Sequence, residues 1–248
     1  MKELWIDTRI NQEEMNFLWD AISDPEKEYE NLNRALVGNI FKSELIEDKD
    51  NWFYETVLKR PIERMFYRDW DNYYKYHVEK EEPLPEFEMY RFWVNYMKQH
   101  EFNPPHDHTG LYSFVIFMKI PTHWKEQHAL PLSANSNSPF ASDFAFVWSR
   151  KDSEICENTN FPLSPEDEGR MLFFPAFLRH QVYPFYECEE ERITISGNIG
   201  LYDPKMQEVS GDVYEEKEKM LKMMENGIEF VKEELKMMKK EREKDGTN

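Results

Sequence analysis

Residues 103–121 read NPPHDHTGLYSFVIFMKIP, and this stretch decides which folds are open to the chain. Residues 111–120 form an almost unbroken apolar run rich in β-branched and aromatic side chains, which predicts a buried strand. His106 and His108 lie directly before that strand. Because side chains alternate along an extended chain, both imidazoles are expected on one face and Asp107 on the other. Two imidazoles one strand repeat apart can reach a single metal ion.

Other strand-like runs surround this stretch. They read EFEMYRFWVNYM (86–97), DFAFVWS (143–149), MLFFPAF (171–177), HQVYPF (180–185) and ERITISGNIGLY (191–202). Short strands in succession, without helical patterns between them, indicate an antiparallel barrel or sandwich and argue against a βαβ fold. The segment from Thr122 to Asp143 is long enough to cover an active site. It contains three candidates for lining a substrate entrance: His123, Trp124 and His128.

Helical patterns occupy both ends of the chain. Asn11, with Glu14 three residues later, predicts an N-cap and capping box before an apolar helix face. A second helix is expected at 52–70, ended or kinked at Pro61. From Asp212 onward, a charged helix carries apolar residues at three- and four-residue steps. This stripe would pack on its own domain or form the seam of a homodimer.

We therefore predict a single domain over residues 1–248. Residues 1–80 would supply helical support, residues 86–203 the β core and residues 212–245 the C-terminal helix. The oligomeric state is expected to be a monomer, or a homodimer through that helix.

The composition restricts partners and compartment. Lys and Arg total 31 against 49 Asp and Glu, and the net charge of −18 disfavours nucleic acid or an anionic membrane as a partner. Aromatic residues make up 15% of the chain, which indicates a packed core and not a disordered protein. Cys156 and Cys188 have no metal-type spacing, and neither a signal-like N-terminus nor a long apolar span is present. A cytoplasmic protein is expected.

Two further places hold polar residues that a packed sheet would not select. His180 follows an apolar run, where a lone histidine is more typical of a hydrogen-bonded core or surface residue than of a ligand. In ERITISGNI, four polar residues alternate with apolar ones: Arg192, Thr194, Ser196 and Asn198. In a sandwich this polar face would ordinarily meet water. It would also suit the lumen of a barrel that binds a carboxylate, because guanidinium offers a planar fork of donors.

Together these motifs resemble the Fe(II)/2-oxoglutarate-dependent oxygenase superfamily, which carries HxD or HxE, a distal His, and an Arg followed two residues later by Ser or Thr. The matching positions here are His106 with His108, then His180, then Arg192 with Thr194. The stretches around them look similar to the branch of predicted 2-oxoglutarate oxygenases of marine phages and bacteria, in which HxH replaces HxD. The resemblance covers roughly residues 86–200, and its order and spacing are more specific than any single motif.

The resemblance implies a mainly β fold with flanking helices, whose core is a double-stranded β-helix of the jelly-roll or cupin-like type. It implies a dioxygenase (hydroxylase) that uses Fe(II), 2-oxoglutarate and O2, with ascorbate as a further candidate. The metal would be held by three residues: His106, His108 and His180. The far carboxylate of 2-oxoglutarate would pair with Arg192, assisted by Thr194, and Asn95 is a weaker cofactor-binding candidate. No catalytic residue beyond the metal ligands is expected.

The second metal ligand is ambiguous in the sequence. The facial triad of the superfamily has two His and one carboxylate, whereas position 108 is His. Either three imidazoles hold the iron, or a bulge brings Asp107 inward in place of one His. Strand parity favours the three imidazoles, a site that would hold Fe(II) less tightly and could take Zn(II) instead.

The prime substrate is not encoded in any motif, and a protein side chain such as proline or a small metabolite is expected. Two other functions remain open. One is a cupin-like three-His metalloenzyme that uses no 2-oxoglutarate, and the other is a non-catalytic jelly-roll module, such as a phage structural protein. If the protein is phage-encoded, its compartment would be the cytoplasm of a bacterial host.

Overall fold

The computed structural model describes residues 4–24, 27–69, 86–149 and 155–202. The chain divides into two compact units, residues 1–200 and 201–248. The predicted helix at 212–245 lies outside the described residues, so the helix, its packing and the domain boundaries remain predictions. Among the described helices, none is long and apolar enough to cross a membrane.

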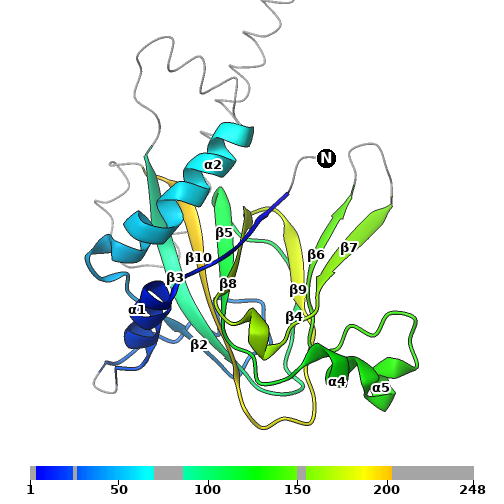
Figure 1. The fold of residues 1–248 in the computed structure, drawn as a ribbon. Coiled ribbons are helices and arrows are strands. Elements are labelled where there is room, and N and C mark those ends of the chain that lie inside the picture. The colour runs from blue at the N-terminus through cyan, green and yellow to red at the C-terminus, as the bar shows by residue number, and fades with distance from the viewer. Residues whose placement is uncertain (1–3, 25–26, 70–85, 150–154, 203–248) are drawn as a thin grey trace, which may run out of the picture. The chain divides into compact units, whose positions relative to one another are not determined.

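Two antiparallel sheets form the framework (Figure 1). The six-stranded sheet has the order β1 (Ile6–Arg9), β8 (Arg170–Pro175), β5 (Tyr112–Lys119), β10 (Arg192–Leu201), β3 (Phe87–Met97) and β2 (Lys42–Leu45). The four-stranded sheet has the order β4 (Asn103–His106), β9 (Arg179–Val182), β6 (Phe144–Ser149) and β7 (Cys156–Phe161). The predicted class, antiparallel β with flanking helices, is confirmed.

The N-terminal helices cover one face of the six-stranded sheet, and the four-stranded sheet lies on the other side (Figure 1). The first helix is α1 (Gln12–Ile22), and its predicted capping box is present: Glu14 N–H donates to Asn11 Oδ1 at 3.0 Å, and Asn11 N–H donates to Glu14 Oε2 at 2.7 Å. A 3-10 turn, η1 (Lys49–Asn51), leads into the second helical segment. The capping box fixes where α1 begins.

The second helical segment lies within the predicted range 52–70 and does not end at Pro61, which is one of the two outcomes expected there. It runs from a π-helical turn, η2 (Tyr54–Leu58), into α2 (Lys59–Asp69). Lys59 N–H donates to Tyr54 O, one residue further back than in an α-helix. Pro61 has no N–H to bond four residues back, and the wider turn directly before it lets the helix continue.

The strand β5 is buried on both faces, which explains its unbroken apolar sequence. Phe114 and Ile116 belong to the core under the helices, while Val115 and Phe117 belong to a second core between the sheets. The predicted cover segment is partly helical, with α4 (Trp124–Ala129) and α5 (Pro131–Ala134), and a 3-10 turn, η3 (Pro165–Asp167), precedes β8.

The polar side of β10 faces the space between the sheets. Thr194 pairs with Phe117 and Ser196 with Val115 across the β10–β5 ladder, so these side chains share one face. Ile195 lies in the opposite core, under the helices. The alternation in ERITISGNI therefore turns its hydroxyl and amide groups inward and not toward water.

Candidate functional site

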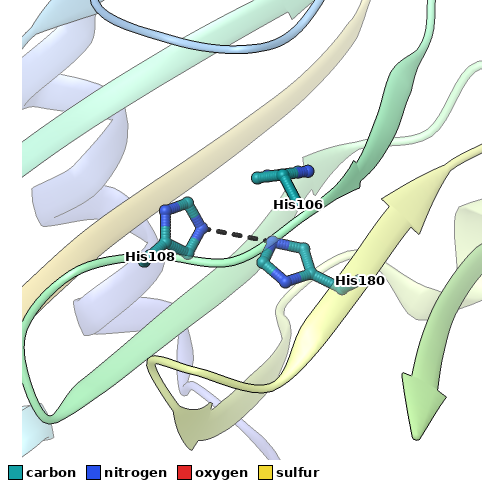
Figure 2. A group of neighbouring side chains, drawn as sticks. All are labelled: His106, His108 and His180. Carbon is teal, nitrogen blue, oxygen red and sulfur yellow. Dashed lines mark hydrogen bonds between the residues drawn. The ribbon is translucent and has the colours of Figure 1, made fainter.

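Three imidazoles meet beside strands β4 and β9 of the four-stranded sheet (Figure 2). His106 ends β4, His108 follows it, and His180 lies in β9 directly opposite His106 in the ladder. The potential ligand atoms of the three residues lie within 4.8 Å of one another. The closest pair is His108 Nε2 and His180 Nε2 at 3.2 Å, and the rings of His106 and His180 are 4.2 Å apart between centroids.

Backbone carbonyls orient two of these rings. His106 Nδ1 lies 2.7 Å from Pro104 O, and His180 Nδ1 lies 3.1 Å from Leu178 O. A carbonyl accepts only, so each Nδ1 carries the proton and each Nε2 keeps its lone pair. Protein ligands of metals commonly show this arrangement, in which the second ring nitrogen is fixed by a hydrogen bond.

Burial keeps the three imidazoles neutral. Desolvation is the largest cause in each case: it lowers the pKa of His106, lowers that of His108 to about 3, and holds that of His180 well below its usual range. Their mutual repulsion, were they charged, acts in the same direction on His108 and His180. Metal ions bind neutral imidazole, so the cluster is ready for a cation at neutral pH.

Asp107 points away from the cluster. Its carboxylate is half exposed, and Oδ2 lies 3.5 Å from Arg179 Nε at the surface. The structure therefore brings together the three predicted histidines and leaves the alternative ligand outside, in agreement with strand parity.

Arg192 is a buried cation with spare donors. Its side chain is 1% exposed, and Nη2 donates to Ser142 O at 2.9 Å and to Ser142 Oγ at 2.5 Å. Nε and Nη1 have no hydrogen-bond partner among the described residues. Burial lowers the pKa of Arg192 to about 10, against the opposing influence of Asp143. Buried donors without partners are costly, and an anion bound at this point would satisfy them.

One short segment connects the cation with the imidazoles. Ser142 contacts Arg192, and two residues later Phe144 packs its ring against His180, with centroids 5.6 Å apart and planes 26° apart. Between them, Asp143 is buried and bonded to His128 Nε2 at 2.8 Å and to Asn160 Nδ2 at 3.1 Å.

Comparison with known proteins agrees with this arrangement. Residues 91–198 match the family model described as "Putative 2OG-Fe(II) oxygenase". All three histidines, Arg192 and Thr194 lie inside the matched region, so the family resemblance inferred from the motifs is confirmed there. No curated protein matches the sequence closely enough to count as a relative.

Two solved structures resemble this chain to different degrees. An oxidoreductase of the 2OG-Fe(II) oxygenase family from Burkholderia pseudomallei is 10% identical, with a TM-score of 0.50 over 79% of this chain and 85% of that one. A prolyl-4-hydroxylase from Pseudomonas putida is also 10% identical, with a TM-score of 0.46 over 82% and 95%. At such identity the likeness to the first structure is one of fold alone.

The remaining predicted site residues lie in different surroundings. Thr194 is half-buried on the inward face of β10, and Asn95 is buried with Oδ1 accepting from Ser43 Oγ at 2.8 Å. In the predicted cover segment, His123 caps α4 by accepting a hydrogen bond from Lys125 N–H, and His128 bonds to buried Asp143. The last two histidines therefore have structural partners.

Sequence reasoning missed two residues beside the oxygenase-like site. Trp93 is 2% exposed with its ring 5.7 Å from that of His108, and its Nε1 has no partner among the described residues. Strand parity placed Trp93 with Asn95 and could have indicated this. Ser142 had no signal in the sequence, because its contact with Arg192 depends on two segments fifty residues apart.

Proposed function

We propose that the protein is an Fe(II)- and 2-oxoglutarate-dependent dioxygenase whose metal is held by His106, His108 and His180. The observation that carries the proposal is the convergence of three neutral imidazoles within 4.8 Å. The family match over residues 91–198 supports it. Asp107 is not a ligand in this proposal, because its carboxylate lies beside Arg179 at the surface.

We further propose that the far carboxylate of 2-oxoglutarate binds Arg192, assisted by the Thr194 hydroxyl, with Asn95 as a weaker contact. When bound, iron and 2-oxoglutarate supply the oxidising power that inserts one oxygen atom of O2 into a substrate C–H bond. Arg192 contributes a fixed positive charge, and its Nε and Nη1 are free among the described residues to donate. The histidines contribute three uncharged donors, a set that Zn(II) would also accept.

The surroundings of His180 are suited to excluding water. Phe144, Phe146 and Phe174 place their rings 5.6, 6.3 and 4.9 Å from that of His180. An apolar wall of this kind strengthens electrostatic contacts inside the site and protects reactive species from solvent. The prime substrate that we propose is a protein side chain such as proline, or a small metabolite.

Metal content tests the ligand set. Full-length protein purified with Fe(II) and ascorbate is expected to hold metal, and the variants His106→Ala, His108→Ala and His180→Ala are expected to lose it, because two protein ligands are too few for a stable site. Asp107→Ala is the matched control and is expected to keep it. Retention of metal by His108→Ala together with its loss from Asp107→Ala would replace our ligand set with the alternative one.

Calorimetry with 2-oxoglutarate tests the activity class. Metal-loaded protein is expected to bind 2-oxoglutarate and to release succinate from it. A protein that holds metal but is indifferent to 2-oxoglutarate would instead be a cupin-like metalloenzyme. A protein that holds no metal under these conditions would be a non-catalytic module.

A further inference from the structure

Ser142 lies two residues before the start of β6, in a backbone conformation that serine rarely adopts. Its φ is +74°, in the left-handed region where a residue with a Cβ is strained and glycine is not. The residue is fully buried, with 0% exposure. Since glycine would suit this backbone better, the contacts of the serine hydroxyl must explain what the side chain does there.

Both acceptors of Ser142 engage a single nitrogen of Arg192. Nη2 of the guanidinium donates to the Ser142 carbonyl at 2.9 Å and to its hydroxyl oxygen at 2.5 Å. Ser142 is itself held in place, because its N–H donates to Pro184 O at 2.9 Å and its Oγ lies 3.1 Å from Thr122 Oγ1. The strained backbone is thus fixed from two sides, and it directs two oxygens at the same corner of the guanidinium.

The remainder of the guanidinium is left for another partner. The Phe185 ring lies 5.0 Å from Arg192 Cζ and packs against the charged group. Nε and Nη1 are buried and have no hydrogen-bond partner among the described residues. A long arginine side chain normally loses conformational freedom when it binds an anion. Here the ordering takes place when the protein folds.

We propose that Ser142 is a positioning residue, which holds Nη2 so that Arg192 presents a remaining donor, Nη1–H or Nε–H, to the far carboxylate of 2-oxoglutarate before that molecule arrives. This inference rests on the proposed function. In this proposal the hydroxyl of Ser142 orients the Arg192 guanidinium. This role explains why a strained serine occupies a position that favours glycine.

The variant Ser142→Gly tests the proposal without disturbing the backbone. Glycine accepts a φ of +74° and keeps the carbonyl contact, so relief of the backbone strain should offset the hydrogen bonds lost with the hydroxyl and leave the melting temperature within a few degrees of the wild type. The dissociation constant for 2-oxoglutarate, measured by calorimetry on full-length Mn(II)-loaded protein, should rise about tenfold, since a hydrogen bond to a charged group is lost. In turnover with Fe(II), KM for 2-oxoglutarate should rise while kcat stays unchanged.

A second buried serine provides the matched control. Ser164 is 6% exposed and bonds to Asp167 at 2.9 Å, away from Arg192. Ser164→Ala should lower the melting temperature and leave 2-oxoglutarate affinity unchanged. The two variants therefore separate orientation of the cation from general stability.

The outcomes distinguish this inference from the proposed function. Unchanged or tighter 2-oxoglutarate binding by Ser142→Gly, with binding abolished in Arg192→Met, would overturn the positioning role alone. Absence of binding by the wild-type protein would overturn both. Nitrogen NMR of ligand-free protein adds a test that needs no 2-oxoglutarate: rotation of the Arg192 guanidinium should be slow in the wild type and fast in Ser142→Gly. Fast rotation in the wild type would overturn the inference.

Discussion

Replacing Arg192 with methionine would remove the charge of the most deeply buried cation among the described residues and keep an unbranched side chain. Arg192 is 1% exposed, and burial lowers its pKa to about 10. A base whose pKa is lowered in the folded state destabilises the fold at every pH below that pKa, and the cost disappears only as the pH rises through about 10 toward the ordinary arginine value. At neutral pH the full cost is therefore present.

The magnitude follows from the pKa and the contacts. An ordinary arginine pKa lies above 12, so at about 1.4 kcal/mol per tenfold change the charged form costs roughly 3 kcal/mol. Methionine removes this cost but also removes two hydrogen bonds to Ser142 and the contact with Phe185. Each is worth about 1 kcal/mol. The removed cost of burying the charge and the lost contacts offset each other, so we expect the stability of the ligand-free variant to lie within about 1 kcal/mol of the wild type.

Thermal unfolding of Mn(II)-loaded protein with and without 2-oxoglutarate measures both effects. At one hundred times the dissociation constant, the ligand should stabilise the wild type by about 2.7 kcal/mol. For a domain of this size that is a shift of about 5–10 °C in melting temperature. Arg192→Met should show no shift, because the anion has lost its cation.

Arg170→Met is the matched control, because this arginine of β8 pairs with Asp7 and Asp167 and does not contact Ser142. It should keep the full ligand-induced shift. A full shift in Arg192→Met would refute the anion-binding role. A fall of more than about 10 °C in the ligand-free melting temperature of Arg192→Met would refute the reasoning about burial.

Three other predictions concern the imidazole cluster and the fold. Metal-free protein should lose stability as the pH falls below about 6.5, because the histidines of the unfolded chain take up protons and those of the folded chain do not. With a folded pKa of about 3, His108 alone should lower the free energy of unfolding by about 2 kcal/mol between pH 7 and pH 5, as measured by urea unfolding. The variant His108→Asn should reduce this pH dependence. Asn11→Ala should lower the melting temperature by about 2–4 °C through loss of the capping box, and an unchanged value would show that the cap contributes nothing. Gly110→Ala should lower the free energy of unfolding in urea by about 3 kcal/mol, since φ is +94° and a Cβ would lie 2.7 Å from Ile199 O. Gly169→Ala should cost less, because φ is +84° but the nearest atom to its Cβ would lie at 3.7 Å. Equal losses in the two variants would mean that the clash at Gly110 is relieved.

The central strands of both sheets were predictable from the sequence, whereas the edges were not. β3, β5, β6, β8, β9 and β10 all correspond to strand-like runs. The four strands that the patterns did not indicate, β1, β2, β4 and β7, are the edge strands of the two sheets. An edge strand has a neighbour on one side only and is often short and polar, so it carries little hydrophobic periodicity.

The pairing of His106 with His108 was predictable because its spacing is local. His180, 72 residues after His108, was indicated only by the family resemblance, and the surroundings of Arg192 were not predictable. His106 and His108 follow strand parity, and a motif two residues apart in sequence is close in space for any extended chain. The contacts of Arg192 depend on how the segment before β6 meets β10, which no pattern within either segment encodes. The sequence left open whether Pro61 ends or kinks the helix for a related reason, because the outcome depends on a wider turn upstream that compensates for the lost hydrogen bond.

The carbonyl contacts of His106 and His180 have a consequence for folding rates. Each ring is aligned by a carbonyl only two residues earlier in the chain, so the direction of each ring is set as soon as that short stretch forms. Joining His108 to His180, however, closes a stretch of 72 residues, which costs about 4 kcal/mol of chain entropy. An ion can bridge the rings only after this closure. Bound metal should therefore leave the folding rate nearly unchanged and slow unfolding, because it binds only after the structure has formed.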